Sequence, residues 1–340
     1  MRSGQKKNFA FAAAMIAVLL SLAAAELMAR GFSPTYRRMH EPPHPFLQSH
    51  PTRQWTLTPG YRGREKWDVE FRVNVLGFRG PEVTKEKPAG VFRVLILGDS
   101  IALGAGLPEE VIVSSRLESR LKQDHPEKNF QVINAGMSGY DLEQEQRLFE
   151  EEGLDLAPDA AVLIACLNDV PGVSISELIN PLRDLPIPFK HFLLNHFALA
   201  LMIQAAYDSI GLREESRLGD RLNADTSLQT QARIEQGWRA YEAGLAAMAK
   251  ESRQRNIKLI LVLVPHAAQF EDPRQRFIPQ RRLAAMCQKL DIFFLDLAPE
   301  FSALPALPYI LPDPVHPNPK GHEIMARMIS DRLKPYILPP

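Results

Sequence analysis

A serine stands at a place in this sequence where its hydroxyl can act as a nucleophile. Ser100 follows Gly98 and Asp99 at the end of the apolar run Val94–Leu97. A short apolar run closed by a glycine predicts a buried strand that ends in a tight turn. Open α/β sheets bind their ligands at the carboxyl ends of such strands, so Ser100 is expected at a ligand-binding edge.

A serine hydroxyl becomes a good nucleophile when a base takes its proton, and the expected base is a histidine held by a carboxylate. Asp313 and His316 stand three positions apart in the segment LPDPVHPNPKGH. The four prolines of this segment restrict its freedom, which helps to hold a catalytic pair in place. Asn318 and Pro319 predict that a helix begins directly afterwards. We therefore predict that Asp313 orients His316 and that His316 activates Ser100.

Two further strand ends offer donors for the oxyanion that forms when a nucleophile attacks an acyl group. Gly136 follows the second predicted strand, where the lack of a side chain lets the backbone N–H approach a substrate closely. Asn168 follows the third, and its side-chain amide can donate as well. Together with the N–H of Ser100, these groups are expected to form an oxyanion hole. His266 ends the fourth strand at the same edge, where it is expected to contact substrate or to cap the turn.

The elements that must position these residues alternate along the chain. Strand-like runs occur at 92–98, 130–134, 160–165, 257–264 and 292–296, and helical patterns occur at 108–123, 140–152, 233–255, 273–290 and 319–333. This alternation predicts an α/β domain with a flavodoxin-like, doubly wound sheet of about five parallel strands and helices on both faces. A helical insertion at 170–232 is too long for a simple connection. Its apolar stretch 190–211 is expected to pack on the domain, to cap the active site or to rest on a membrane surface.

The amino end predicts a membrane anchor. Three basic residues precede an apolar run at 9–25 that, as a helix, is about as long as a bilayer core is thick. Basic residues at the amino end favour a cytoplasmic start. We therefore expect a single-pass inner-membrane protein whose catalytic domain is periplasmic. Cleavage after Ala25 as a signal peptide is the alternative. The expected domains are an anchor at 1–30, a proline-rich tether with a small β appendage at 31–88, and a catalytic domain at 89–340.

Composition and charge exclude other classes of protein. Lys and Arg number 40 and Asp and Glu also number 40, so nothing indicates a nucleic-acid partner. Cys166 and Cys287 are too few for a disulfide framework or a structural zinc site. Buried thiols are expected, and a single disulfide between them stays open. No metal and no cofactor is expected, since a triad accounts for Asp313 and hydrogen bonds within turns account for Asp99 and Asp169.

Taken in order, these motifs resemble the SGNH, or GDSL-type, hydrolase family over roughly residues 90–335. The matching blocks are GDS with Ser100, NAGxSG with Gly136, ND with Asn168, and DxxH with Asp313 and His316. The resemblance implies that Ser100 is the nucleophile, His316 the base and Asp313 its orienter. It likewise implies an oxyanion hole formed by Ser100, Gly136 and Asn168.

Some positions depart from the patterns of related enzymes. Ile101 replaces the leucine that follows GDS, and Cys166 replaces the glycine that usually begins the third block. Ala102 stands where the G-x-S-x-G elbow of ordinary α/β-hydrolases has its second glycine, which disfavours that fold. The segment VNVLGFRGPE and the N-terminal span resemble a membrane-anchored bacterial subgroup.

The expected activity is hydrolysis of O-acyl esters, above all acetyl esters, by a serine esterase that forms an acyl-enzyme. The expected partners are an acylated small molecule, an envelope glycan or a lipid as substrate, and the membrane through the N-terminal helix. An O-acyltransferase that passes the acyl group to a cell-envelope polysaccharide has the same triad and stays open. A third hypothesis is a glycan-binding assembly protein without catalysis. The intact triad argues against this hypothesis.

Overall fold

A computed structural model describes residues 3–32, 45–65, 68–170, 197–199, 202, 228–270, 278–310, 313 and 315–337. Its contacts divide the chain into one unit of residues 1–43 and 179–224 and a second unit of residues 44–178 and 225–340. Most of the insertion expected at 170–232 lies outside the described residues, so the expected roles of its apolar stretch stay predictions.

Five parallel strands form the sheet of the second unit, which confirms the predicted fold class. In spatial order they are β6 (Asn129–Asn134), β5 (Val91–Gly98), β7 (Ala160–Ala165), β8 (Lys258–Leu263) and β9 (Phe293–Asp296). Every pairing between them is parallel. The chain runs through β5, continues to β6 on one side and then crosses to β7 on the other. Doubly wound sheets bind ligands where the strand order reverses in this way, which here is beyond the carboxyl end of β5.

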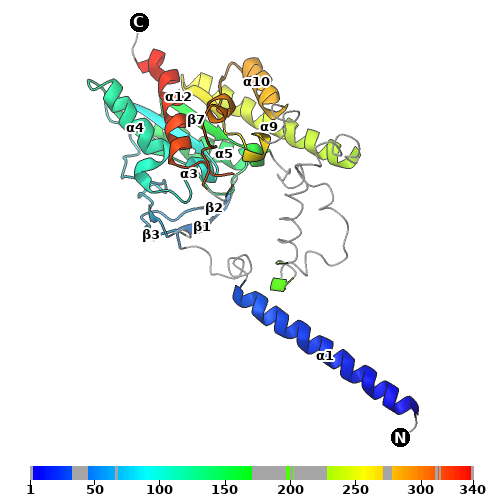
Figure 1. The fold of residues 1–340 in the computed structure, drawn as a ribbon. Helices are drawn as coiled ribbons and strands as arrows, with labels where there is room; N and C mark the ends of the chain where they lie inside the picture. The colour runs from blue at the N-terminus through cyan, green and yellow to red at the C-terminus, as the bar shows by residue number, and fades with distance from the viewer. Residues whose placement is uncertain are drawn as a thin grey trace. The chain divides into compact units, whose positions relative to one another are not determined.

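Helices cover both faces of this sheet (Figure 1). α4 (Val113–Asp124) and α12 (Pro319–Ile337) pack on one face, and α5 (Leu142–Leu148), α9 (Leu228–Gln254) and α10 (Ile278–Leu290) pack on the other. Residues of β5 alternate between the two cores: Val94 and Ile96 lie in the first, whereas Leu95 and Leu97 lie in the second. Burial on both faces explains why this strand is continuously apolar.

Short helical turns lie between the longer elements. They are α3 (Ser100–Leu103), η1 (Glu109–Val111), η2 (Phe149–Gly153), η3 (Leu154–Leu156), η4 (Leu167–Asp169), η6 (Ala267–Phe270) and α11 (Ala298–Ser302). Two of them, α3 and η4, directly follow the strands β5 and β7, so they lie at the edge of the sheet where the sequence places Ser100 and Asn168.

Two antiparallel hairpins precede the sheet. β1 (Leu47–His50) pairs with β2 (Gln54–Leu57), and β3 (Arg62–Arg64) pairs with β4 (Glu70–Arg72). The second hairpin lies in the segment expected as a β appendage. The first one lies in the segment expected to contain a proline-rich tether, yet it packs on the sheet, because Phe46 and Leu57 are buried in the core of the second unit. Trp55 also donates through Nε1 to the carbonyl of Ser138, at 3.0 Å.

The N-terminal helix α1 (Ser3–Phe32) lies in the other unit. Its stretch Ala13–Phe32 has the length and the hydropathy, 1.8 on average, of a membrane span, a criterion that signal sequences also meet. Glu26 is a charged residue within this stretch. Its carboxylate accepts hydrogen bonds from Arg30 at 2.8 Å and from the backbone N–H groups of Ala198 and Leu199, both at 2.9 Å. Thus α1 contacts a helical piece of the insertion.

Candidate active site

Ser100 begins α3 immediately after β5. The turn between them depends on Gly98, whose φ is +139°, because a Cβ at this position would lie 2.4 Å from the carbonyl oxygen of Ile164. Asp99 is buried, and its Oδ1 accepts the N–H of Ile101 at 2.8 Å. This hydrogen bond caps the first turn of α3, in line with the turn hydrogen bonding expected for Asp99.

The C-terminal loop brings a histidine and a carboxylate to Ser100. His316 Nε2 lies 2.8 Å from Ser100 Oγ, although the two residues are 216 positions apart. His316 Nδ1 lies 2.7 Å from Asp313 Oδ2. The loop folds around this carboxylate, since Oδ1 of Asp313 accepts the N–H of Val315 at 2.7 Å and that of His316 at 3.1 Å. The structure therefore brings together the three residues expected to form a triad.

The protonation of this chain of hydrogen bonds follows from Asp313. Burial on its own raises the pKa of Asp313, but the hydrogen bonds from the His316 ring and the two backbone N–H groups outweigh it and lower the pKa to about 2. Asp313 is thus ionised at neutral pH and can accept a hydrogen bond from His316 Nδ1–H. In a ring with its proton on Nδ1 alone, Nε2 is a lone-pair acceptor facing Ser100, as a general base requires.

The loop after β6 differs from the expectation for Gly136. The N–H of Gly136 donates to Oδ1 of Asn134 at 2.9 Å, so it is engaged within the protein. A Cβ at Gly136 would lie 2.2 Å from the backbone nitrogen of Leu103, which shows that the missing side chain lets α3 pack closely on this loop. The structure therefore gives Gly136 a packing role in place of the expected oxyanion donor.

Asn134 connects two parts of this site, and the sequence did not predict that connection. It is buried at the end of β6, and its Nδ2 donates to the carbonyl of Ala102 at 2.9 Å and to Ser114 Oγ at 3.2 Å. One side chain thus links the loop of Gly136 to the helix that begins with Ser100. The available signal was a polar residue at the end of an otherwise apolar strand.

The turn after β7 resembles the turn after β5, because in each a buried aspartate accepts a backbone N–H. Asn168 lies in η4 directly after β7, where the sequence places it, and its side chain lies outside the described part of the chain. Asp169 is buried, and its Oδ2 accepts the N–H of Cys166 at 2.7 Å. Cys166 Sγ lies 3.4 Å from Asp99 Oδ2 and 3.7 Å from Asp169 Oδ1. Cys166 and Cys287 are both buried thiols, and no disulfide joins them.

Within the described residues, Asp99, Cys166 and Asp169 form the one group that could offer three ligand atoms to a metal ion, all within 4.8 Å of one another. Each carboxylate already accepts a backbone N–H, from Ile101 and from Cys166 respectively. Burial and the charge of Asp99 raise the pKa of Asp169 well above its usual value. Hydrogen bonds at the two turns therefore account for the cluster.

Glu145 of α5 lies fully buried close to these acids. Among the described residues, neither oxygen of its carboxyl group has a hydrogen-bond partner. Burial, together with the charges of Asp169 and Asp99, raises its pKa well above the usual value. Glu145 therefore retains its proton to a higher pH than an exposed glutamate does.

Two further histidines lie near the triad. His266 follows β8 and is half-buried, and its N–H donates to Gln269 Oε1 at 2.9 Å. Burial lowers the pKa of His266, while the charge of Asp313 opposes that shift. His322 is buried in α12, where Nδ1 accepts the N–H of Val113 at 3.1 Å and burial lowers its pKa to about 3. His322 is thus a packing residue, and His266 lies beside the triad.

The chain is similar to known proteins in sequence and in structure. A family model described as GDSL-like lipase/acylhydrolase matches residues 96–324. No curated protein shows significant similarity to the chain. The acetyl xylan esterase AlAXEase is 16% identical, and the likeness covers 71% of this chain and 100% of that one with a TM-score of 0.45. An acetyl xylan esterase from Geobacillus stearothermophilus is 20% identical, with 74% and 96% covered and a TM-score of 0.43.

The psychrotrophic esterase EstA from Pseudoalteromonas sp. is 15% identical, with 72% of this chain and 98% of that chain covered and a TM-score of 0.43. The family match spans most of the chain and contains the three residues joined by hydrogen bonds, so this chain belongs to the GDSL-like lipase/acylhydrolase family.

Proposed function

We propose that this protein is a serine esterase that hydrolyses O-acyl esters through an acyl-enzyme. The observation that carries the proposal is the unbroken chain of hydrogen bonds from Asp313 through His316 to Ser100, at 2.7 and 2.8 Å. Ester hydrolysis by a member of the GDSL-like lipase/acylhydrolase family needs an activated nucleophile, and this arrangement supplies one.

The proposed reaction has two halves. Ser100 Oγ attacks the acyl carbon, its proton passes to His316 Nε2, and ionised Asp313 stabilises the imidazolium that results. His316 then gives this proton to the oxygen of the leaving alcohol as the ester bond breaks. In the second half, water takes the place of the alcohol: His316 removes its proton, the hydroxide attacks the acyl carbon, and Ser100 is released with its proton restored.

An oxyanion hole supports both halves in this proposal. The N–H of Ser100 lies in the first turn of α3, where backbone N–H groups have no partner within the helix. The side-chain amide of Asn168 stays the second proposed donor. Since the N–H of Gly136 is engaged with Asn134, we propose Gly139 as the third. Gly139 lies in the same loop with φ +77°, and its N–H has no hydrogen-bond partner in the described part of the chain.

The proposed substrates are acetyl or other O-acyl esters of an envelope glycan or a lipid. The experiment compares the purified full-length protein with Ser100→Ala on aryl esters of increasing acyl length and on acetylated glycans. We expect the wild type to hydrolyse short esters and the variant to be inactive. Transfer of the acyl group to an added glycan in preference to water would establish the O-acyltransferase alternative instead. Glycan binding with no turnover by the wild type would establish an assembly protein.

We further propose that α1 holds the protein in the inner membrane with its catalytic unit in the periplasm. The span Ala13–Phe32 supports this by length and composition. The hydrogen bonds of Glu26 to Arg30 and to two backbone N–H groups support it too, because a charged group at membrane depth needs such partners. A C-terminal fusion to a reporter that is active only in the cytoplasm should be silent. An active fusion would contradict this topology, and an amino terminus beginning at Glu26 would establish cleavage.

A further inference from the structure

The loop that follows Ser100 is held by residues that come from outside the matched family segment. That segment begins at residue 96, whereas Glu65 and Arg79 lie in the N-terminal appendage, between β3 and β5. Arg79 pairs with Asn134 of β6 in an isolated antiparallel bridge. The appendage is thereby joined to the edge of the catalytic sheet.

The guanidinium of Arg79 binds the end of α3 and the loop beyond it. Nη1 donates to the carbonyls of Leu103 and Gly104, at 2.9 and 2.7 Å, and Nη2 donates to that of Leu107, at 2.6 Å. The last carbonyls of a helix have no partner within it and carry partial negative charge. A single buried cation thus satisfies three acceptors of the segment that Ser100 begins.

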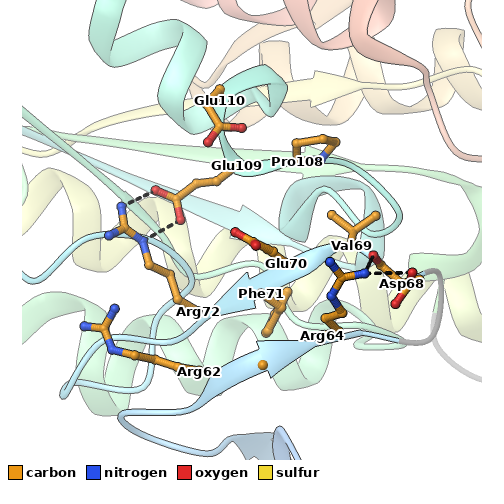
Figure 2. Close-up of a pocket in the computed structure, with 11 residues that line it drawn as sticks. Arg62, Arg64, Asp68, Val69, Glu70, Phe71, Arg72, Pro108, Glu109 and Glu110 are labelled. Atoms are coloured by element: carbon orange, nitrogen blue, oxygen red, sulfur yellow. Dashed lines mark hydrogen bonds and ion pairs between the residues drawn. The ribbon is translucent and has the colours of Figure 1, made fainter.

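The same loop is also bound through one of its N–H groups. Glu65 is buried, and its Oε1 accepts the N–H of Gly106 at 2.6 Å. Burial lowers the pKa of Arg79, and the negative charge of Glu65 opposes that shift, so the two side chains support each other. On the surface, Arg72 of β4 donates to both oxygens of Glu109 in η1 at 2.7 and 2.6 Å, across the groove drawn in Figure 2. The appendage therefore holds the loop from several sides.

We propose that Arg79 is a positioning residue for Ser100 and that the appendage is part of the catalytic unit. The carbonyl of Ser100 accepts the N–H groups of Gly104 and Ala105, both at 3.0 Å, so movement of this loop is transmitted to the nucleophile. Through that path Arg79 sets the direction of Ser100 Oγ towards His316. The expected effect of Arg79 on catalysis rests on the proposed function, whereas its expected effect on the loop rests on the loop contacts alone.

The test uses the full chain with Arg79→Lys, which keeps the charge but cannot reach all three carbonyls. We expect kcat to fall by about tenfold to 10²-fold with KM nearly unchanged, because small displacements of a nucleophile cost rates of this order. Amide hydrogen exchange in residues 103–107 should become at least about tenfold faster. Arg62→Lys is the matched control, since Arg62 is an exposed arginine of the same appendage, 65% accessible. It should leave kcat and exchange unchanged.

A second pair of variants tests the proposal independently, in case Arg79→Lys does not fold. Glu65→Gln keeps an oxygen that can accept from Gly106, whereas Glu65→Leu does not, so activity should survive in the first and fall in the second. A lower melting temperature with unchanged kcat per folded protein and unchanged exchange at 103–107 would overturn the proposal. If the wild type cleaves no ester, the proposed function fails on its own, and the exchange rates still decide whether Arg79 holds the loop.

Discussion

Asp313→Asn replaces one oxygen of the orienting carboxylate by an NH₂ group, and the structure determines which one. Oδ1 of Asp313 accepts two backbone N–H groups, those of Val315 and His316 at 2.7 and 3.1 Å, so the amide oxygen must take this place. The NH₂ group then faces His316 Nδ1, where Oδ2 now lies at 2.7 Å. Nδ1 must accept that hydrogen bond, and the ring proton moves to Nε2, the atom that faces Ser100. A ring in this tautomer cannot take the serine proton.

We expect kcat to fall by roughly 10³–10⁴-fold, the loss known for the same tautomer change in a serine protease triad. The assay is kcat/KM on a short aryl ester at neutral pH, with nitrogen NMR of the histidine rings to report the tautomer. Asp331→Asn changes a half-exposed carboxylate in α12. It is the matched control and should leave kcat/KM unchanged. Activity of Asp313→Asn within tenfold of the wild type would refute the reasoning.

The same variant has a measurable effect on stability. The pKa of Asp313 falls from its usual value of 3.8 to about 2 on folding, which corresponds to at most about 2.4 kcal/mol, and solvent screening of this partly exposed side chain lowers that figure. Because the folded pKa is depressed, this stabilisation is present above pH 3.8 and is lost as the pH falls through about 2. The difference in unfolding free energy between wild type and Asp313→Asn should therefore shrink between pH 4 and pH 2. A difference that stays constant with pH would contradict the assigned pKa.

Three other changes test the surroundings of the triad. Glu145 has a raised pKa, so its own contribution to stability is complete below its ordinary value of 4.5 and declines as the pH rises towards the folded pKa. The melting temperature of Glu145→Gln relative to the wild type should therefore rise between pH 5 and pH 8, and an equal difference at both pH values would contradict this. Gly136→Ala should lower both stability and activity, because its Cβ would lie 2.2 Å from the backbone nitrogen of Leu103. An unchanged melting temperature would show that the loop can move to make room for the Cβ, against this prediction. Asn168→Ala should lower kcat by about 10²–10³-fold with little change in melting temperature, as loss of one oxyanion donor does, and unaltered turnover would remove it from the oxyanion hole.

Much of the catalytic sheet follows from the sequence because its strands are buried on both faces. Runs such as Val94–Leu97 and Ala160–Ala165 are apolar throughout, and each ends where a polar turn begins. The loop of Asp313 and His316 is also predictable, since its prolines and the helix behind it limit where the pair can lie. These parts can be predicted from the sequence because each depends on residues that are close together along the chain.

The parts that were missed depend on contacts between distant segments. The strand β1 shows no apolar alternation, as its middle residues Gln48 and Ser49 are exposed, and the hairpin is held mainly by burial of Phe46 and Leu57. The glycine in the loop after β6 indicates a close approach but not which way its N–H points, and the side chain of Asn134 decides that. Arg79 gives no periodic signal at all, because its partners lie about 25 residues further along the chain.

The central claim is that Ser100 attacks an acyl carbon with the help of His316. The most direct measurement is mass spectrometry of the intact protein and its peptides after reaction with an aryl phosphonate ester, which traps an activated serine as a covalent adduct. We predict one adduct per chain, located on Ser100, absent from Ser100→Ala and formed far more slowly by His316→Ala. An adduct on another residue, or equal labelling of Ser100→Ala, would contradict the account.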